Sequence, residues 1–226
     1  MKPKITVIGS LNIDLVVKSS KFPASGETIL GDSLKYLSGG KGANQAVAAS
    51  RLGAEVSMIG AVGDDIYGEK LIEILRSDKI NTSSIKTVQG EPSGVAIIFL
   101  EEKDNRIIVI QGANAHCTKE DIDSHQDIIK NSDLVLLQLE IPLETVLYAV
   151  ELAKKFNKTI VLNPAPAQKL PDSLLQQINV ITPNETELYA LTLETADLNS
   201  LSARMNSLLE KGVQHGQERQ VHMGEV

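Results

Sequence analysis

Short apolar runs alternate with longer amphipathic stretches along most of this chain of 226 residues. Apolar runs of this length are typical of buried strands, and the amphipathic stretches have helical spacing. The alternation indicates βαβ units, so the sequence predicts an α/β fold with a mainly parallel sheet and helices on both faces. Expected strands are residues 5–11, 56–62, 133–140 and 159–163; expected helices are 43–52, 67–79, 143–156 and 197–211; residues 179–191 are expected to form a strand that continues into a helix.

Two segments interrupt this alternation. Residues 15–38 mix short β-prone pieces with turn signals, and residues 94–110 contain two apolar runs around a charged turn, which predicts a hairpin. We interpret both segments as an additional β element and as a candidate lid over a binding site. Further along, Thr118 followed by Asp121 has the spacing of a capping box and predicts the start of another helix.

Composition excludes several classes of function. The net charge is −7, which disfavours nucleic acid or an anionic membrane as a partner. Aromatic residues make up 3% of the chain and tryptophan is absent, so base-stacking surfaces are not expected. The single cysteine, Cys117, excludes an internal disulfide and fits a reducing compartment. The first residues lack the apolar run of a signal peptide, and no apolar run reaches the roughly 18 residues of a membrane span. We therefore expect a cytoplasmic protein.

A glycine-rich loop, SGGKGAN, directly precedes the expected helix at 43–52. Loops of this kind often bind phosphate, but the pattern differs from both common phosphate motifs. The P-loop pattern G-x-x-x-x-G-K-S/T fails because Gly42 follows Lys41, and the dinucleotide pattern G-x-G-x-x-G fails because no glycine stands at the last position. The loop could hold a ligand with hydroxyl groups, since lysine and asparagine donate hydrogen bonds, or it could be a tight turn only.

Polar residues follow several of the expected strands. Asn12 and Asp14 follow the first strand, Glu140 ends the run at 133–140, and Asn184 ends the "VITPN" run, with Glu187 one helical turn later. Parallel strands bind ligands at their carboxyl ends, so these groups are expected on one rim. Asparagine and aspartate are also common turn and cap residues, which is the plainer interpretation. For Asp14, Glu140 and Lys41 together we favour a site that recognises hydroxyl groups, such as those of a sugar.

Six blocks of the sequence resemble the ribokinases, a branch of the phosphofructokinase-B-type carbohydrate kinase family. They are NIDLVV, FPASGET, SGGKGANQAVAASRLGA, GAVGDDIYG, LNPAPA and ITPNETE. The similarity runs almost continuously from Ile5 to the region of Gly212. It implies a ribokinase-like three-layer α/β sandwich with a small β-sheet lid. It also implies ATP-dependent phosphorylation of D-ribose to ribose 5-phosphate, with Mg²⁺ as cofactor, ATP as co-substrate and a possible homodimer through the lid.

The resemblance also implies a role for each matching residue. Asn12 and Asp14 would bind sugar hydroxyls, and Glu140 would be a further sugar contact. Asn184 would approach the nucleotide phosphates, and Glu187 would help to organise Mg²⁺ through a water molecule. The glycine-rich loop would wrap the ribose, through Gly39, Gly40, Lys41, Gly42 and Asn44.

One signature of the family is missing. The stretch D-T-x-G-A-G-D, which supplies an anion hole and the aspartate that accepts the proton of the attacking hydroxyl, occurs nowhere in this sequence. We therefore assign no catalytic residue, and the monovalent-cation site expected in the family is absent with it. Residues 1–212 are expected to form an incomplete, C-terminally truncated domain, and residues 213–226 a divergent polar tail in which His215 and His222 have no metal-ligand partners.

Two alternatives to a ribose kinase stay open. The chain could be a non-catalytic sugar-binding fragment, or it could derive from a kinase for another sugar or a nucleoside. In either case the missing part would leave an unpaired sheet edge beside the "VITPN" strand, which predicts low solubility or self-association.

Overall fold

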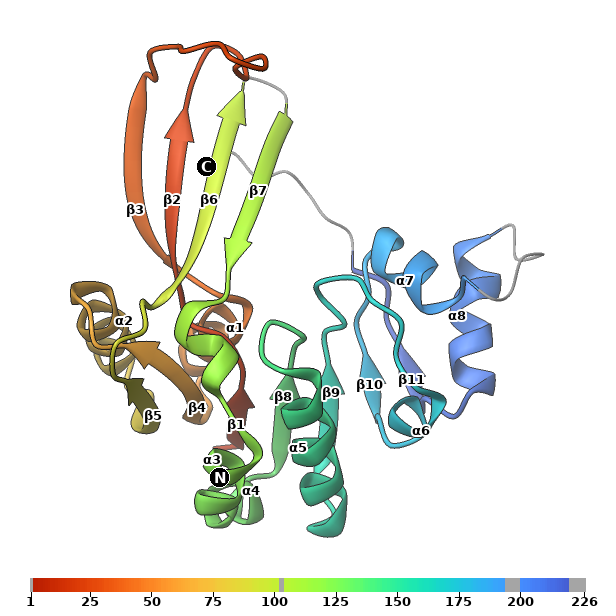
Figure 1. Cartoon of the computed structure of the whole chain (residues 1–226). Coiled ribbons are helices and arrows are strands. Elements are labelled where there is room, and N and C mark those ends of the chain that lie inside the picture. The colour runs from red at the N-terminus through yellow and green to blue at the C-terminus, as the bar shows by residue number, and fades with distance from the viewer. Residues whose placement is uncertain (1, 102–103, 194–199, 220–226) are drawn as a thin grey trace.

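The larger of two sheets in the computed structural model has seven strands in the order β11-β10-β9-β8-β1-β4-β5, and every neighbouring pair is parallel. The structure describes residues 2–101, 104–193 and 200–219 (Figure 1). This arrangement confirms the predicted α/β fold. The strands are β1 (Lys4–Ile8), β4 (Glu55–Gly63), β5 (Asn81–Val88), β8 (Leu134–Leu137), β9 (Thr159–Leu162), β10 (Val180–Ile181) and β11 (His215–Gly216).

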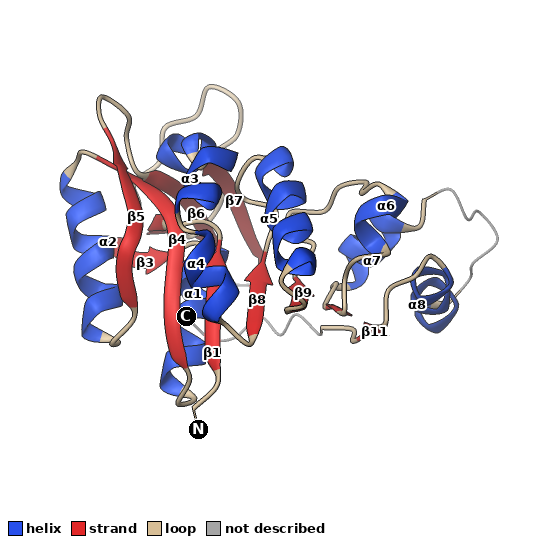
Figure 2. Cartoon of the chain, turned by 90° about the horizontal axis from the view of Figure 1, so that it is seen from below, coloured by secondary structure: helices blue, strands red, loops and turns tan. Residues whose placement is uncertain are grey.

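Helices cover both faces of this sheet. Successive side chains of one strand point to opposite faces, and each enters a different hydrophobic cluster. Val7 packs in one cluster with side chains from α1 and α2, whereas Ile8 packs in the other with side chains from α4 and α5. Figure 2 shows α2 at the β5 end of the sheet and α8 at the β11 end. The helices are α1 (Lys41–Arg51), α2 (Ile66–Ser77), α3 (Lys119–Ser124), α4 (Gln126–Asn131), α5 (Leu143–Lys155), α6 (Asp172–Leu175), α7 (Glu185–Leu191) and α8 (Leu201–Glu210).

Among the helices of the described ranges, none has both the length and the apolar character that a bilayer span requires.

The second sheet, called the lid below, forms from the two segments that were predicted to be an additional β element. Its four strands have the order β3-β2-β6-β7, with β2 (Asn12–Lys18) in the interior beside β6 (Gly94–Glu101). The edge strands are β3 (Ser33–Gly39) and β7 (Asp104–Ile110), and each pairs antiparallel with its inner neighbour. Figure 1 shows this sheet standing away from the parallel sheet above α1 and α2. The β6–β7 pair confirms the hairpin predicted over 94–110, whose residues 102–103 lie outside the described ranges.

Three of the differences from the sequence-based expectations concern strands of the parallel sheet. The first strand ends at Ile8 rather than continuing to residue 11, because Gly9 and Ser10 lead the chain out of the parallel sheet and into the lid. Strand β5 was not anticipated, since its polar start, NTSS, hides the apolar pattern. The polar segment after Gly212 forms β11 beside β10, so β10 is not the edge of the sheet.

Two other predictions are confirmed, the second of them in part. The capping box at Thr118 is present at the start of α3. The last expected helix, 197–211, is found as α8, while its residues 197–199 lie outside the described part of the chain, as do residues 220–226 of the tail with His222.

Candidate functional site

The candidate site lies where the lid joins the parallel sheet. The turn after β1, the first residues of β2, the end of β3, the first turn of α1 and the residues that follow β8 meet there. This is the carboxyl rim of the parallel sheet, where ligands bind in folds of this type. Asn12 and Asp14 follow the first strand, as expected, but they belong to the start of a lid strand.

Two glycines let the backbone pass closely along this rim. Gly40 has φ of 89°, and a Cβ atom there would lie 2.8 Å from the backbone nitrogen of Asn12. A Cβ atom on Gly39 would lie 2.2 Å from both carboxylate oxygens of Asp14. A side chain at either position would therefore displace the residues that the sequence analysis assigned to sugar binding.

The helix N-terminus behind the loop is already occupied by protein groups. The N–H of Lys41 donates to Glu140 Oε2 at 3.0 Å, and the N–H of Gly42 donates to Ser10 Oγ at 3.3 Å. The N–H of Ala43 donates to the backbone oxygen of Ser10 at 2.9 Å. Phosphate binding at a helix terminus needs such N–H groups to be free. The loop is therefore not a phosphate cradle of that kind.

Glu140 is the buried centre of this arrangement. Its Oε1 accepts from the Lys41 ammonium at 2.9 Å, and its Oε2 accepts from Ser10 Oγ at 2.5 Å in addition to the Lys41 N–H. Burial opposes the charged form, but the Lys41 charge and these hydrogen bonds outweigh it and hold the pKa of Glu140 below its usual value. Glu140 thus fixes the loop, and its capacity for a further ligand contact is small.

Asp14 has the opposite character. Within the described ranges its carboxylate accepts no hydrogen bond, although it is half-buried against the glycine loop. Burial first, and the nearby charge of Glu140 second, raise the pKa of Asp14 to about 6, while the Lys41 charge acts in the other direction. A carboxylate in this state is a strong acceptor without an internal donor, and it is available to the hydroxyl group of a ligand.

Asn12 is held by a residue that the sequence analysis did not identify. The Nδ2 group of Asn114 donates to Asn12 Oδ1 at 2.8 Å and to the backbone oxygen of Leu11 at 3.0 Å. Its Oδ1 accepts the N–H of Leu11 at 2.9 Å. Asn114 belongs to a 3₁₀ turn, Gly112–His116, that directly follows lid strand β7.

The Asn44 side chain makes no hydrogen bond to the other candidate-site residues of the described ranges, whereas two residues that were not predicted do. Asn44 lies in the first turn of α1 with an exposed side chain, which makes no hydrogen bond to the part of the chain that the structure describes. Ser10 and Gln111 were missed: Ser10 binds Glu140, and Gln111 Nε2 donates to the Glu140 backbone oxygen at 3.3 Å. Ser10 was a usable signal, because it is a polar residue near the end of a mainly apolar expected strand, whereas nothing in the sequence marked Gln111.

Asn184 and Glu187 lie on the same rim but away from this group, since β10 is separated from β1 by β9 and β8. They form a reciprocal capping box at the start of α7. The Asn184 N–H donates to Glu187 Oε2 at 2.8 Å, and the Glu187 N–H donates to Asn184 Oδ1 at 2.8 Å. The guanidinium of Arg219 lies 3.2 Å from Glu187 Oε1 and 3.3 Å from Oε2.

These contacts decide whether Glu187 fits the Mg²⁺ role that the resemblance implies. Its carboxylate is nearly fully buried and already paired with a permanent cation and a backbone donor. No cluster of three or more acidic, histidine or cysteine side chains that could hold a metal occurs among residues 2–101, 104–193 and 200–219. In this arrangement the residues present do not fit a bound Mg²⁺, and we derive no chemical step through one.

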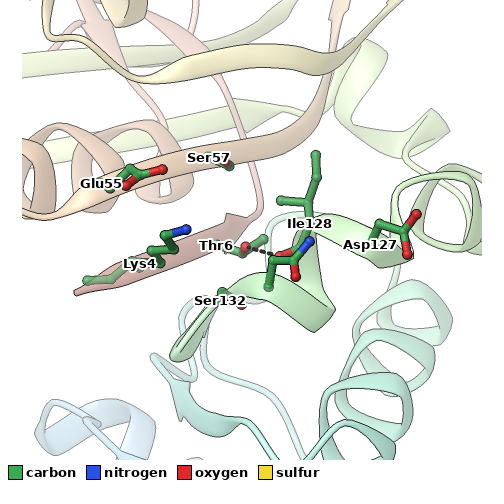
Figure 3. A pocket seen from close by; sticks show the side chains of 9 residues that line it. Lys4, Thr6, Glu55, Ser57, Asp127, Ile128 and Ser132 are labelled. Atoms are coloured by element: carbon green, nitrogen blue, oxygen red, sulfur yellow. Dashed lines mark hydrogen bonds between the residues drawn. The ribbon is translucent and has the colours of Figure 1, made fainter. Parts of the chain in front are cut away.

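A separate hollow lies at the opposite, amino-terminal edge of the sheet. Figure 3 shows Lys4 and Glu55, from the starts of β1 and β4, on one side of this hollow, and Asp127, Ile128 and Ser132, from α4 and the residue after it, on the other. The hollow contains none of the residues of the candidate site, and it lies at the opposite edge from the carboxyl ends of the strands, where ligands bind in folds of this type. We therefore assign the candidate site to the lid junction.

The fold and the site together define a two-sheet α/β protein with a polar cluster where its β lid begins. A family model described as pfkB family carbohydrate kinase matches residues 2–216. The chain therefore belongs to the pfkB family of carbohydrate kinases.

Individual relatives show the same similarity. The chain is 42% identical over 216 residues to the ribokinase of Haemophilus influenzae, covering 95% of this chain and 71% of the relative. It is 42% identical over 212 residues to the deoxyribokinase of Salmonella typhimurium, covering 92% and 69%. A solved structure of Arabidopsis thaliana ribokinase complexed with ribose and ATP superimposes with a TM-score of 0.83 at 31% identity, covering 96% of this chain and 72% of that one.

Proposed function

We propose that the lid junction of this chain binds D-ribose. It would be the sugar site of a kinase that transfers the γ-phosphoryl group of ATP to ribose and so forms ribose 5-phosphate. The observation that carries the proposal is the Asp14 carboxylate, which is half-buried against Gly39 and has no donor within the described ranges. Two further facts support it: ribokinases are among the similar proteins, and the Arabidopsis relative was solved with ribose and ATP.

The groups at the site suit a sugar chemically. Asp14 accepts a hydrogen bond from a hydroxyl, and the amide of Asn12 and the ammonium of Lys41 donate to hydroxyl oxygens. Glu140 and Ser10 hold the loop rather than the ligand, since their polar atoms bind one another and Lys41. Asn44 and the lid strands would close over the sugar from the solvent side, and the nucleotide would approach from the side of Asn184.

Phosphoryl transfer is the step for which this chain is least equipped. We propose that the 226-residue chain, tested alone, binds the sugar but transfers phosphate far more slowly than a kinase. The family's D-T-x-G-A-G-D stretch, with its proton acceptor and anion hole, does not occur in the sequence. Mg²⁺, when bound with ATP, neutralises phosphate charge in such reactions. Here the Glu187 carboxylate is paired with Arg219.

A second substrate has specific support. The Salmonella relatives at 42% identity are named deoxyribokinases, a similarity equal to that of the Haemophilus ribokinase. The two sugars differ at one hydroxyl, so discrimination depends on whether that hydroxyl is hydrogen-bonded. A site built to bind a hydroxyl rejects the analogue that lacks it strongly, because its own polar groups are then left unpaired.

The test is direct binding of the sugar. Isothermal titration of the purified chain with D-ribose, and separately with 2-deoxyribose, is expected to show binding of one or both. Asp14→Asn is expected to weaken that binding by about tenfold or more, because a charge-assisted hydrogen bond contributes about 1.5–3 kcal/mol. Asp78→Asn, at an exposed pair with Arg51, is the matched control. Unchanged ribose affinity in Asp14→Asn would contradict the assignment.

We also propose that two copies associate through their lids in the cytoplasm. Apolar side chains of the lid edge strands are exposed: Leu34, Tyr36, Leu37, Ile107, Ile108, Val109 and Ile110. Patches of this kind mark interaction surfaces. Sedimentation of the wild-type chain is expected to show a dimer that Ile108→Glu converts to a monomer, while an exposed substitution remote from the lid, Leu52→Glu, leaves it dimeric. A monomeric wild type would contradict this proposal.

A further inference from the structure

The ends of the lid strands β2, β6 and β7 that lie nearest the parallel sheet meet at one buried side-chain amide, that of Asn114. Its residue is 1% exposed, and it lies four residues after the end of β7. Strand β2 begins at Asn12, which accepts from Asn114, and strand β6 begins at Gly94. A Cβ atom on Gly94 would lie 2.2 Å from both Asn114 Nδ2 and Asn12 Oδ1, so β6 passes directly over the hydrogen bond that joins them.

The orientation of the Asn114 amide is fixed by the backbone. The N–H of Leu11 can only donate, so it must face Asn114 Oδ1, and the carbonyl of Leu11 can only accept, so it must face Nδ2. The two ends of the amide therefore cannot exchange without breaking both bonds.

The same logic then fixes the amide of Asn12. Because Asn114 Nδ2 is a donor, the atom of Asn12 that faces it at 2.8 Å must be the oxygen. The Asn12 nitrogen is consequently the end that is left to donate to a ligand. Two residues further along β2, Asp14 offers a carboxylate that accepts, so the strand presents a donor followed by an acceptor.

We propose that Asn114 is a positioning residue that makes Asn12 a hydrogen-bond donor to the sugar. It also connects this donor, at the start of β2, to the segment that follows β7. The proposal rests on the proposed sugar-binding function, and it deepens that function by assigning the polarity of the Asn12 contact. Asn114 does not touch the ligand in this scheme; it acts through Asn12.

The test replaces the Asn114 donor with an acceptor of the same shape. In Asn114→Asp an oxygen faces Asn12 Oδ1, so the Asn12 amide turns over and presents its oxygen to the ligand. Ribose affinity, measured by titration calorimetry near neutral pH, is expected to fall by about tenfold or more. The hydrogen bond from the Asn12 nitrogen to the sugar is lost, and the Asn12 oxygen then faces a sugar oxygen.

Asn179→Asp is the matched control, because both ends of the Asn179 amide are also hydrogen-bonded, the oxygen to a backbone N–H and the nitrogen to a side chain. Its Oδ1 accepts the N–H of Ile160 at 2.7 Å and its Nδ2 donates to Gln214 Oε1 at 2.8 Å, away from the lid. We expect both variants to melt at a lower temperature, but only Asn114→Asp to lose ribose affinity. Equal losses of affinity in both variants would show a general structural effect and would overturn the proposal.

A double-mutant cycle separates action through Asn12 from other causes. If Asn114 acts through Asn12, then Asn114→Asp adds little to the loss of ribose affinity already caused by Asn12→Ala. Additive losses would contradict the positioning role. Failure of the wild-type chain to bind ribose would instead refute the proposed function, whereas wild-type binding with unchanged affinity in Asn114→Asp would refute this inference alone.

Discussion

Asp14 carries a cost in stability that its proposed role explains. An ordinary aspartate has a pKa of 3.8, and that of Asp14 is about 6 in the folded chain. The folded state therefore binds more protons than the unfolded state between these values, so stability falls as pH rises through this window and stays reduced above it. The proposed sugar contact gives this group a role other than folding.

Replacing this carboxylate by a neutral amide of the same shape separates stability from binding. Asp14→Asn is expected to raise the melting temperature near neutral pH by about 2–4 °C, equivalent to ~1 kcal/mol after allowance for partial exposure. The gain should vanish near pH 4, where the wild-type side chain is protonated. Thermal melts at both pH values test this. An unchanged or lower melting temperature at neutral pH would show that Asp14 has an internal donor in solution.

Ribose affinity should also depend on pH, because it depends on the protonation state of Asp14. The charged carboxylate accepts a hydroxyl more strongly than the neutral acid, so affinity is expected to be constant above pH 7 and to fall below about pH 6, by up to about tenfold per pH unit. The profile of Asp14→Asn should be flat over the same range. A fall of equal size in both proteins would assign the pH dependence to another group.

At the scale of elements, the glycine loop is held by the Lys41–Glu140 pair. The Lys41 side chain is 37% exposed and that of Glu140 is 7% exposed, so removing the lysine leaves a buried carboxylate without its cation. Breaking a fully buried pair costs about 3–5 kcal/mol, and partial exposure reduces our expectation for Lys41→Met to about 1–2 kcal/mol. Urea unfolding tests this against Lys21→Met, at the exposed Lys21–Glu27 pair. Equal effects of the two substitutions would contradict a structural role for the buried pair.

The C-terminal segment forms a comparable contact at the other end of the sheet. It runs beside β10 through backbone bonds from Gln217 to Ile181 at 3.0 Å and from Arg219 to Pro183 at 2.8 Å, which brings the Arg219 guanidinium to the buried Glu187. In this geometry the carboxylate that resembles a metal-organising residue is already paired with a cation.

Removing Arg219 tests whether this arginine and Mg²⁺ compete for the Glu187 carboxylate. Arg219→Ala is expected to lower the melting temperature and to make it respond to millimolar MgCl₂, because a divalent ion that binds the native state stabilises it. The wild type should show no such response, and Arg51→Ala, at the exposed pair with Asp78, is the control. A wild-type chain stabilised by Mg²⁺ as strongly as Arg219→Ala would contradict the competition.

For the whole molecule, the sequence was sufficient for most elements that have a clear local periodicity. The parallel sheet, the lid hairpin and the glycine loop follow from apolar runs, a charged turn and glycine spacing. Contacts between distant positions could not be predicted in this way: Asn114 and Leu11 are 103 positions apart, and nothing in the segment QGANAH indicates a buried amide. The short strand β11 was also missed, because pairing by two residues leaves no pattern in a polar segment.

The final prediction concerns the activity of the molecule as a whole. Two carboxylates lie at the proposed sugar site, and neither suits proton abstraction from the attacking hydroxyl: Glu140 is ion-paired and hydrogen-bonded, and Asp14 is assigned to holding the sugar. General-base catalysis typically contributes about 10²–10⁴-fold, and preorganised donors at a developing anion about 10²–10³-fold. Without either, a typical kinase rate of ~1–100 s⁻¹ falls close to background.

The measurement is ADP and ribose 5-phosphate formation by the purified 226-residue chain with ribose, ATP and Mg²⁺, with the Haemophilus influenzae ribokinase as positive control. We expect ribose binding by calorimetry but turnover at least about a hundredfold below the control, in line with the loss of one such contribution. Turnover near the control rate would contradict the prediction. In that case Asp14→Asn and Glu140→Gln would show which carboxylate acts as the base, since the substitution that abolishes turnover while retaining ribose binding identifies it.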